Sequence, residues 1–135
     1  MIRNKKGFTL VELLAVIVVL AIIIIIALPN VINAMNRAKE GSFKIYAKRA
    51  ISDAQSSYQA DELMGNGGGA CYTIATIGLG ANGKYTGWVD TTGADYKVYI
   101  TDGTFVIPGL TINQIDALTS VTSGSSAGTV PAGCK

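Results

Sequence analysis

The chain has 135 residues, with 11 basic and 9 acidic side chains, two cysteines and no histidine. This length allows one small domain, and the lack of histidine excludes the ordinary nucleophile–histidine–acid triad of hydrolases. The aspartates and glutamates form no paired catalytic motif, so we expect neither an enzyme nor a cofactor or metal site.

A long apolar segment lies near the N-terminus. From Leu13 to Leu28 no residue is polar, and a single acid, Glu12, precedes this run. As a helix, residues 8–28 span roughly 30 Å, which is enough to cross a bilayer. Positive charges before the segment should stay in the cytoplasm and leave the C-terminus outside. A carboxylate in hydrocarbon costs roughly 2.5–3.5 kcal/mol on insertion scales, so Glu12 needs a positive partner.

The string Gly7-Phe8-Thr9-Leu10-Val11-Glu12 resembles the class III signal and N-terminal helix of type IV prepilins. The resemblance covers about residues 1–60. It implies that a prepilin peptidase cuts between Gly7 and Phe8 and methylates the new amine of Phe8. Phe8 and Glu12 are four residues apart and share a helix face, so this amine and carboxylate are expected to pair during assembly. An ordinary secretory signal fits less well, because residues 8–28 exceed a typical h-region and no small-x-small cleavage site follows cleanly.

The helix is expected to continue to about residue 63. Pro29 removes one backbone donor and crowds the carbonyl of Ile25, so a bend is predicted there, and Gly41-Ser42 offers a second position for a bend. Beyond it, apolar residues at three- and four-residue spacings predict a buried stripe formed by Phe43, Ala47, Ala50, Ile51, Ala54 and Tyr58. The expected organisation is a leader (1–7), a hydrophobic transmembrane or filament-core helix (8–29), its amphipathic continuation (30–64) and a globular β-sheet head (65–135).

Glycine and asparagine in residues 64–69 should end the helix. The three consecutive glycines lack the lysine and hydroxyl residue of a nucleotide-binding loop, which favours a connector. β-Branched and aromatic residues then predict three or four antiparallel strands within residues 71–77, 85–91, 96–101 and 104–107. Asp102-Gly103 predicts a hairpin turn between the last two.

The segment after these strands is more ambiguous. The spacing of Thr111 and Gln114 fits a capping box, so residues 112–118 are expected to form a short helix, although a last strand fits nearly as well. Residues 120–133 are expected to be loop. The fold class is therefore α+β, with a long bent helix packed against a small antiparallel sheet.

Cys71 and Cys134 are the only cysteines, and both follow the membrane segment. An even pair on the exported side favours a disulfide over a reactive or metal-binding thiol. The family resemblance also implies a disulfide around the C-terminal region. Residues 90–95 could hold calcium on a loop, as heads of some type II secretion pseudopilins do, but they lack EF-hand spacing and are better explained as a solvated turn.

Two classes of function fit these features. The first is a subunit of a helical filament that serves adhesion, twitching motility or DNA uptake. A major type IV pilin ranks first, followed by a minor pilin, a type II secretion pseudopilin and a competence pilin. The second is a membrane-anchored binding protein that works as a monomer, which would not need Glu12. After residue 50 the sequence contains three basic and seven acidic residues. No broad nucleic-acid surface is therefore expected on the head, although nucleic-acid binding stays open as a function.

The resemblance also implies partners and a location. The partners are copies of the chain itself, the prepilin peptidase, and the pilus assembly platform with its ATPase. The precursor would reside in the cytoplasmic membrane, and the assembled subunit would form a surface filament.

Overall fold

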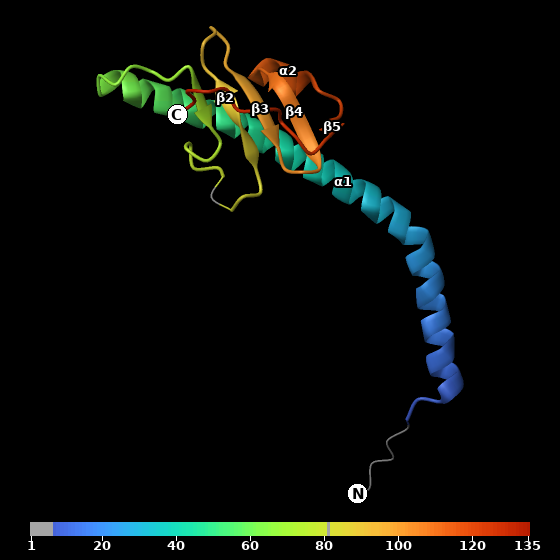
Figure 1. Ribbon diagram of the computed structural model, residues 1–135. Coiled ribbons are helices and arrows are strands. Elements are labelled where there is room, and N and C mark those ends of the chain that lie inside the picture. The colour runs from blue at the N-terminus through green and yellow to red at the C-terminus, as the bar shows by residue number, and fades with distance from the viewer. Residues whose placement is uncertain (1–6, 81) are drawn as a thin grey trace, which may run out of the picture. The chain divides into compact units, whose positions relative to one another are not determined.

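The computed structural model describes residues 7–80 and 82–135 (Figure 1). It divides the chain into two compact units, the first ending at Ala38 and the second running Lys39–Lys135. Helix α1 (Leu10–Leu63) contributes residues to both units, which confirms the predicted long helix. Pro29 lies inside α1. A bend at this residue stays a prediction, and the leader residues before Gly7 lie outside the described residues.

The C-terminal end of α1 is capped by its own backbone. Gly65 adopts a left-handed φ of 75°, and its N–H donates to the Glu62 carbonyl at 3.2 Å, while the N–H of Asn66 donates to the Asp61 carbonyl at 3.0 Å. These two bonds make a Schellman motif, for which glycine is the usual residue because it has no Cβ to clash. The helix therefore ends where the sequence predicts.

The second unit contains a five-stranded antiparallel meander in the order β1-β2-β3-β4-β5. The strands are β1 (Cys71–Thr73), β2 (Thr86–Asp90), β3 (Lys97–Thr101), β4 (Phe105–Leu110) and β5 (Thr122–Ser123). The antiparallel meander is confirmed, but it has five strands where three or four were expected.

Apart from shifts of one residue, the sheet differs from the prediction in three places. β1 ends at Thr73 rather than residue 77, because the Thr73 side chain accepts the Thr76 N–H at 3.1 Å and its carbonyl accepts the Ile77 N–H at 3.2 Å. These local bonds turn the chain out of the sheet. β4 extends to Leu110. The predicted loop after residue 120 contains β5, which pairs with Phe105 and Val106 of β4.

One face of the sheet packs on the predicted stripe of α1. The stripe residues Phe43, Ala47, Ala50, Ile51 and Ala54 are each at most 3% exposed, and Tyr58 packs at the edge of the same cluster. The sheet contributes the fully buried side chains Val89, Val98, Ile100 and Ile107. The small alanines and the larger residues around them belong to one buried cluster that fills the space between helix and sheet. This packing confirms the predicted helix-on-sheet architecture.

A second helix, α2 (Ile112–Ala117), completes the head. Its first turn carries the predicted capping box: Gln114 Oε1 accepts the Thr111 N–H at 3.0 Å, and Thr111 Oγ1 accepts the Gln114 N–H at 3.5 Å. Lys48 of α1 makes a 2.8 Å ion pair with Asp116 of α2. The helical alternative for this segment is therefore confirmed over the strand.

Candidate processing and assembly site

An exposed, non-helical segment directly precedes α1. Gly7, Phe8 and Thr9 precede α1 and all three are exposed, with the Phe8 side chain 91% accessible. A Cβ added to Gly7 would meet nothing within 4 Å. Among the described residues, both sides of the Gly7–Phe8 peptide bond are therefore exposed, and cleavage there stays a prediction.

Thr9 and Glu12 form a capping box at the start of α1. Glu12 Oε2 accepts the Thr9 N–H at 2.9 Å, and Thr9 Oγ1 accepts the Glu12 N–H at 3.3 Å. The reciprocal bonds satisfy two of the four N–H groups that have no partner within the helix. The Thr-x-x-Glu spacing in the sequence is typical of this motif. The capping box was not predicted, because Glu12 was considered only as a partner for an amine.

Phe8 and Glu12 are nevertheless brought to one place. Both line an open hollow at the helix start, together with Gly7 and Thr9. In the uncleaved chain the nitrogen of Phe8 is a peptide nitrogen, and the charged amine arises only after the bond to Gly7 is cut. The Phe8–Glu12 pairing therefore stays a prediction for the processed protein.

The remainder of the apolar segment is exposed on all sides within the chain. Its large side chains between Leu13 and Leu28 retain between 51% and 72% of their accessible surface. α1 is long and apolar enough there to cross a membrane. Apolar surface of this extent is unfavourable in water, so this segment requires lipid or other protein around it.

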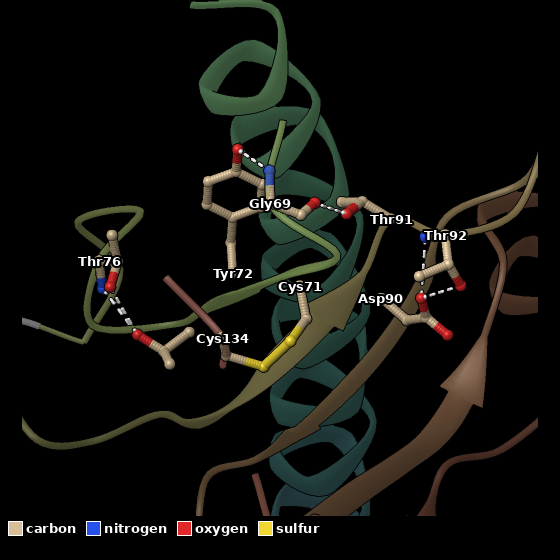
Figure 2. Close-up of a disulfide and its surroundings, with 9 residues drawn as sticks. Gly69, Cys71, Tyr72, Thr76, Asp90, Thr91, Thr92 and Cys134 are labelled. Carbon is tan, nitrogen blue, oxygen red and sulfur yellow. Dashed lines mark hydrogen bonds between the residues drawn. A yellow bond between two sulfur atoms is a disulfide. The ribbon is translucent and has the colours of Figure 1, made fainter. Parts of the chain in front are cut away.

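In the head, the predicted disulfide joins Cys71 and Cys134, with their Cα atoms 4.7 Å apart. Figure 2 shows the bridge beside the start of β1, where Gly69 N–H donates to the Tyr72 hydroxyl at 2.9 Å and the Thr91 hydroxyl donates to the Gly69 carbonyl. Lys135 continues past the bridge and pairs with the edge of β1 through its backbone, at 3.0 Å to Cys71 and 2.8 Å to Thr73. The disulfide thus fixes a short backbone pairing that covers the edge strand.

An ionic cluster of Asp61, Tyr72 and Lys135 lies next to this edge. The Asp61 carboxylate accepts from the Tyr72 hydroxyl at 2.6 Å and from Lys135 Nζ at 2.8 Å. Lys135 Nζ also donates to the Gly67 carbonyl at 2.8 Å. Sequence reasoning missed this cluster, because Asp61 and Lys135 are 74 positions apart and neither has a local signal.

These contacts shift the pKa values of all three groups. The bond from Lys135, and after it the bond from Tyr72, holds the pKa of Asp61 below its ordinary 3.8. The bond to Asp61 raises the pKa of Lys135 above 10.5. Burial, followed by the bond to Asp61, raises the pKa of the Tyr72 phenol above 10.0. All three shifts favour an ionised pair with a neutral phenol at neutral pH.

The turn after β2 binds its own backbone. Asp90 Oδ1 accepts the Thr92 N–H at 2.9 Å and the Thr92 hydroxyl at 2.7 Å (Figure 2). These two bonds hold the pKa of Asp90 below its ordinary value. Within residues 7–80 and 82–135, no three acidic, histidine or cysteine side chains gather into a group that could hold a metal ion. The geometry is that of an Asx turn.

Comparison with known proteins adds one match. Residues 2–28 match the family model described as the prokaryotic N-terminal methylation motif, a segment that contains Gly7, Phe8 and Glu12. Curated proteins and solved structures give no match to the chain. Together with the long apolar helix, this match identifies residues 2–28 as the class III signal peptide of type IV pilins, and it supports a type IV pilin-like or pseudopilin protein.

Proposed function

We propose that the chain is the major structural subunit of a type IV pilus. The prepilin peptidase cuts it between Gly7 and Phe8 and methylates the new amine. The subunit waits in the cytoplasmic membrane, and the assembly machinery then polymerises it into a helical surface filament through the apolar half of α1. The filament serves adhesion, motility or DNA uptake.

The exposed apolar surface of α1 carries this proposal. Between Leu13 and Leu28 every large side chain is at least half exposed in the single chain. Before assembly, membrane lipid covers this apolar surface. Once the subunit leaves the membrane, other copies of the same helix must cover it, at roughly 25 cal/mol for each Å² of apolar area buried. A heterologous contact repeated along an axis then builds an open filament.

Glu12 favours a filament subunit over a monomeric anchored protein. An anchor needs no acid within its apolar helix, and an uncompensated acid there is unfavourable. The Thr9 amide supplies one hydrogen bond to the Glu12 carboxylate but no positive charge. The free amine of a processed Phe8, from the same or a neighbouring copy, supplies that charge. An intact Glu12 also favours the body of the filament, since tip subunits of this family often lack the acid.

Substitution of Gly7 tests the processing step. In Gly7→Val the branched side chain should block the peptidase, so the precursor should accumulate in the membrane and surface filaments should be lost. The measurement is mass spectrometry of the N-terminal peptide, from membranes and from sheared surface filaments. Wild-type filaments should contain this chain as their main component, starting at a methylated Phe8.

Gly41→Val is the matched control for this change. Gly41 also belongs to an exposed stretch of the chain, and an added Cβ there would meet nothing within 4 Å. The Gly41→Val precursor should be cut between Gly7 and Phe8 as in the wild type. A mature N-terminus near Pro29 or later would instead identify an ordinary secretory signal and refute the proposal. Sheared filaments with only traces of the chain would favour a minor pilin or pseudopilin.

A further inference from the structure

Two asparagines in the head are each followed by glycine, at Asn66-Gly67 and Asn82-Gly83. All four residues are exposed, and both glycines have a φ of 64°. Because glycine has no side chain, its backbone nitrogen can reach the side-chain amide of the preceding asparagine more easily than that of any other residue. Exposure and the φ of the glycine do not distinguish the two pairs.

Hydrogen bonding does distinguish them. The Gly83 N–H donates to the Gly80 carbonyl at 2.8 Å, and this bond fixes the Gly83 nitrogen within a turn. The Gly67 N–H has no acceptor among residues 7–80 and 82–135, and neither does the Asn66 side chain make a hydrogen bond with them. Both reacting groups of the first pair are therefore available, whereas the second pair must break a bond before it can react.

We propose that Asn66 is a site of spontaneous deamidation in the folded protein. The Gly67 nitrogen attacks the side-chain carbonyl carbon of Asn66 and loses its proton, while the bond from that carbon to the amide nitrogen breaks and ammonia leaves. Water then opens the five-membered imide at either carbonyl. The products are aspartate, or isoaspartate in which the main chain runs through the side-chain carbon. No oxidant or reductant takes part.

The surroundings make this change consequential for the junction between α1 and β1. The Asn66 N–H is held by the Asp61 carbonyl at 3.0 Å, and the Gly67 carbonyl is held by Lys135 Nζ, which also binds the Asp61 side chain. Isoaspartate inserts a methylene between these two attachment points. The new carboxylate also adds one negative charge just after the end of α1. The modified chain therefore loosens Lys135 from Gly67.

Peptide mapping of the full-length chain tests the proposal. The folded protein, purified in detergent, and the same protein unfolded in denaturant are incubated side by side at mildly alkaline pH. One hydrogen bond is worth about 1 kcal/mol net, so in the folded protein Asn66 should react about fivefold faster than Asn82, at 1.36 kcal/mol per factor of ten. In the unfolded chain the two rates should be about equal. Asn66→Gln should remove the fast product and leave the rate at Asn82 unchanged.

Two results would overturn the assignment. One is a rate at Asn82 that equals or exceeds the rate at Asn66 in the folded protein. The other is an unmodified Asn66 in the folded protein after a time in which the unfolded chain has reacted at both positions. This inference does not depend on filament formation, because it concerns the folded head alone.

Discussion

The Asp61 carboxylate connects three parts of the second unit. It lies in the last turns of α1, accepts a hydrogen bond from the Tyr72 hydroxyl of β1, and pairs with Lys135 beyond the disulfide. The Asp61–Lys135 pair is partly shielded, with side-chain exposures of 22% and 38%. Such a pair is worth more than an isolated surface pair when several hydrogen bonds share one carboxylate.

The stability of the head should therefore depend on pH at both extremes. The pKa of Asp61 is lowered below 3.8 in the folded state, so its contribution is complete above 3.8 and disappears as pH falls through the folded value. The pKa of Lys135 is raised above 10.5, so its contribution is complete below 10.5 and disappears as pH rises through the folded value. Asp61→Asn should lower the unfolding temperature at neutral pH, and the difference from wild type should vanish in acid.

Thermal unfolding of the full chain in detergent, followed by the fluorescence of the single tryptophan Trp88, measures this effect. Asp53→Asn is the matched control, because Asp53 pairs with Arg49 at 3.4 Å on an exposed helix face and should contribute little. A difference between Asp61→Asn and wild type that stays constant from neutral pH into acid would contradict the assigned role of the carboxylate.

At the scale of elements, local signals in the sequence predicted what local chemistry determines. The helix end, the hairpin at Asp102-Gly103 and the capped helix α2 each depend on residues within a few positions of one another. Asp102 confirms its turn by accepting the N–H groups of Thr104 at 2.9 Å and Phe105 at 2.8 Å. The stripe of α1 was equally predictable, because its period is set by the helix itself.

Most of the features that were not predicted depend on contacts between residues far apart in the sequence. The early end of β1 is the exception, because it depends on a local side-chain bond. β5 has two exposed residues, and it exists because Thr122 and Ser123 pair with β4. β1 was expected to be longer because Ile74 and Ile77 favour strands, yet the Thr73 hydroxyl competes for the backbone and turns the chain after three residues. The cluster around Asp61 and the pairing of Lys135 with β1 join residues from opposite ends of the head beside the disulfide, and no local pattern indicates them.

The disulfide is the element whose removal should weaken the head most. It closes a loop with a sequence separation of 63. In the chain-entropy model a loop of this length stabilises the fold by about 4 kcal/mol, so the double variant with Cys71→Ser and Cys134→Ser should lose about that much. Urea unfolding followed by Trp88 fluorescence measures the loss. Wild-type protein with its disulfide reduced is the control and should match the variant. A loss below about 1 kcal/mol would show that packing alone holds the head.

At the scale of the whole molecule, one helix serves two environments. In the second unit, the alanine and aromatic side chains on one face of α1 are buried against the sheet. In the first unit, the apolar side chains of α1 are exposed. The single acid of the exposed half, Glu12, has two separate properties. Its oxygen caps the helix by accepting the Thr9 N–H, and its negative charge can attract the amine of a processed Phe8. The proposed assembly depends on the charge, because capping can be completed within one chain.

Two substitutions of Glu12 separate these properties. Glu12→Gln keeps an oxygen that can cap the helix but removes the charge, and Glu12→Ala removes both. Both variants should be inserted and cut normally, yet assemble poorly. Loss of one charge-assisted contact of about 1.5–3 kcal/mol reduces subunit association tenfold or more, at 1.4 kcal/mol per factor of ten. Sheared filaments quantified by mass spectrometry and imaged for subunit spacing measure this loss.

Thr9→Val is the control that weakens the cap and keeps the charge, and it should still form filaments. Abundant, normally spaced filaments of Glu12→Gln with few from Thr9→Val would show that Glu12 acts by capping its own helix rather than by pairing with an amine.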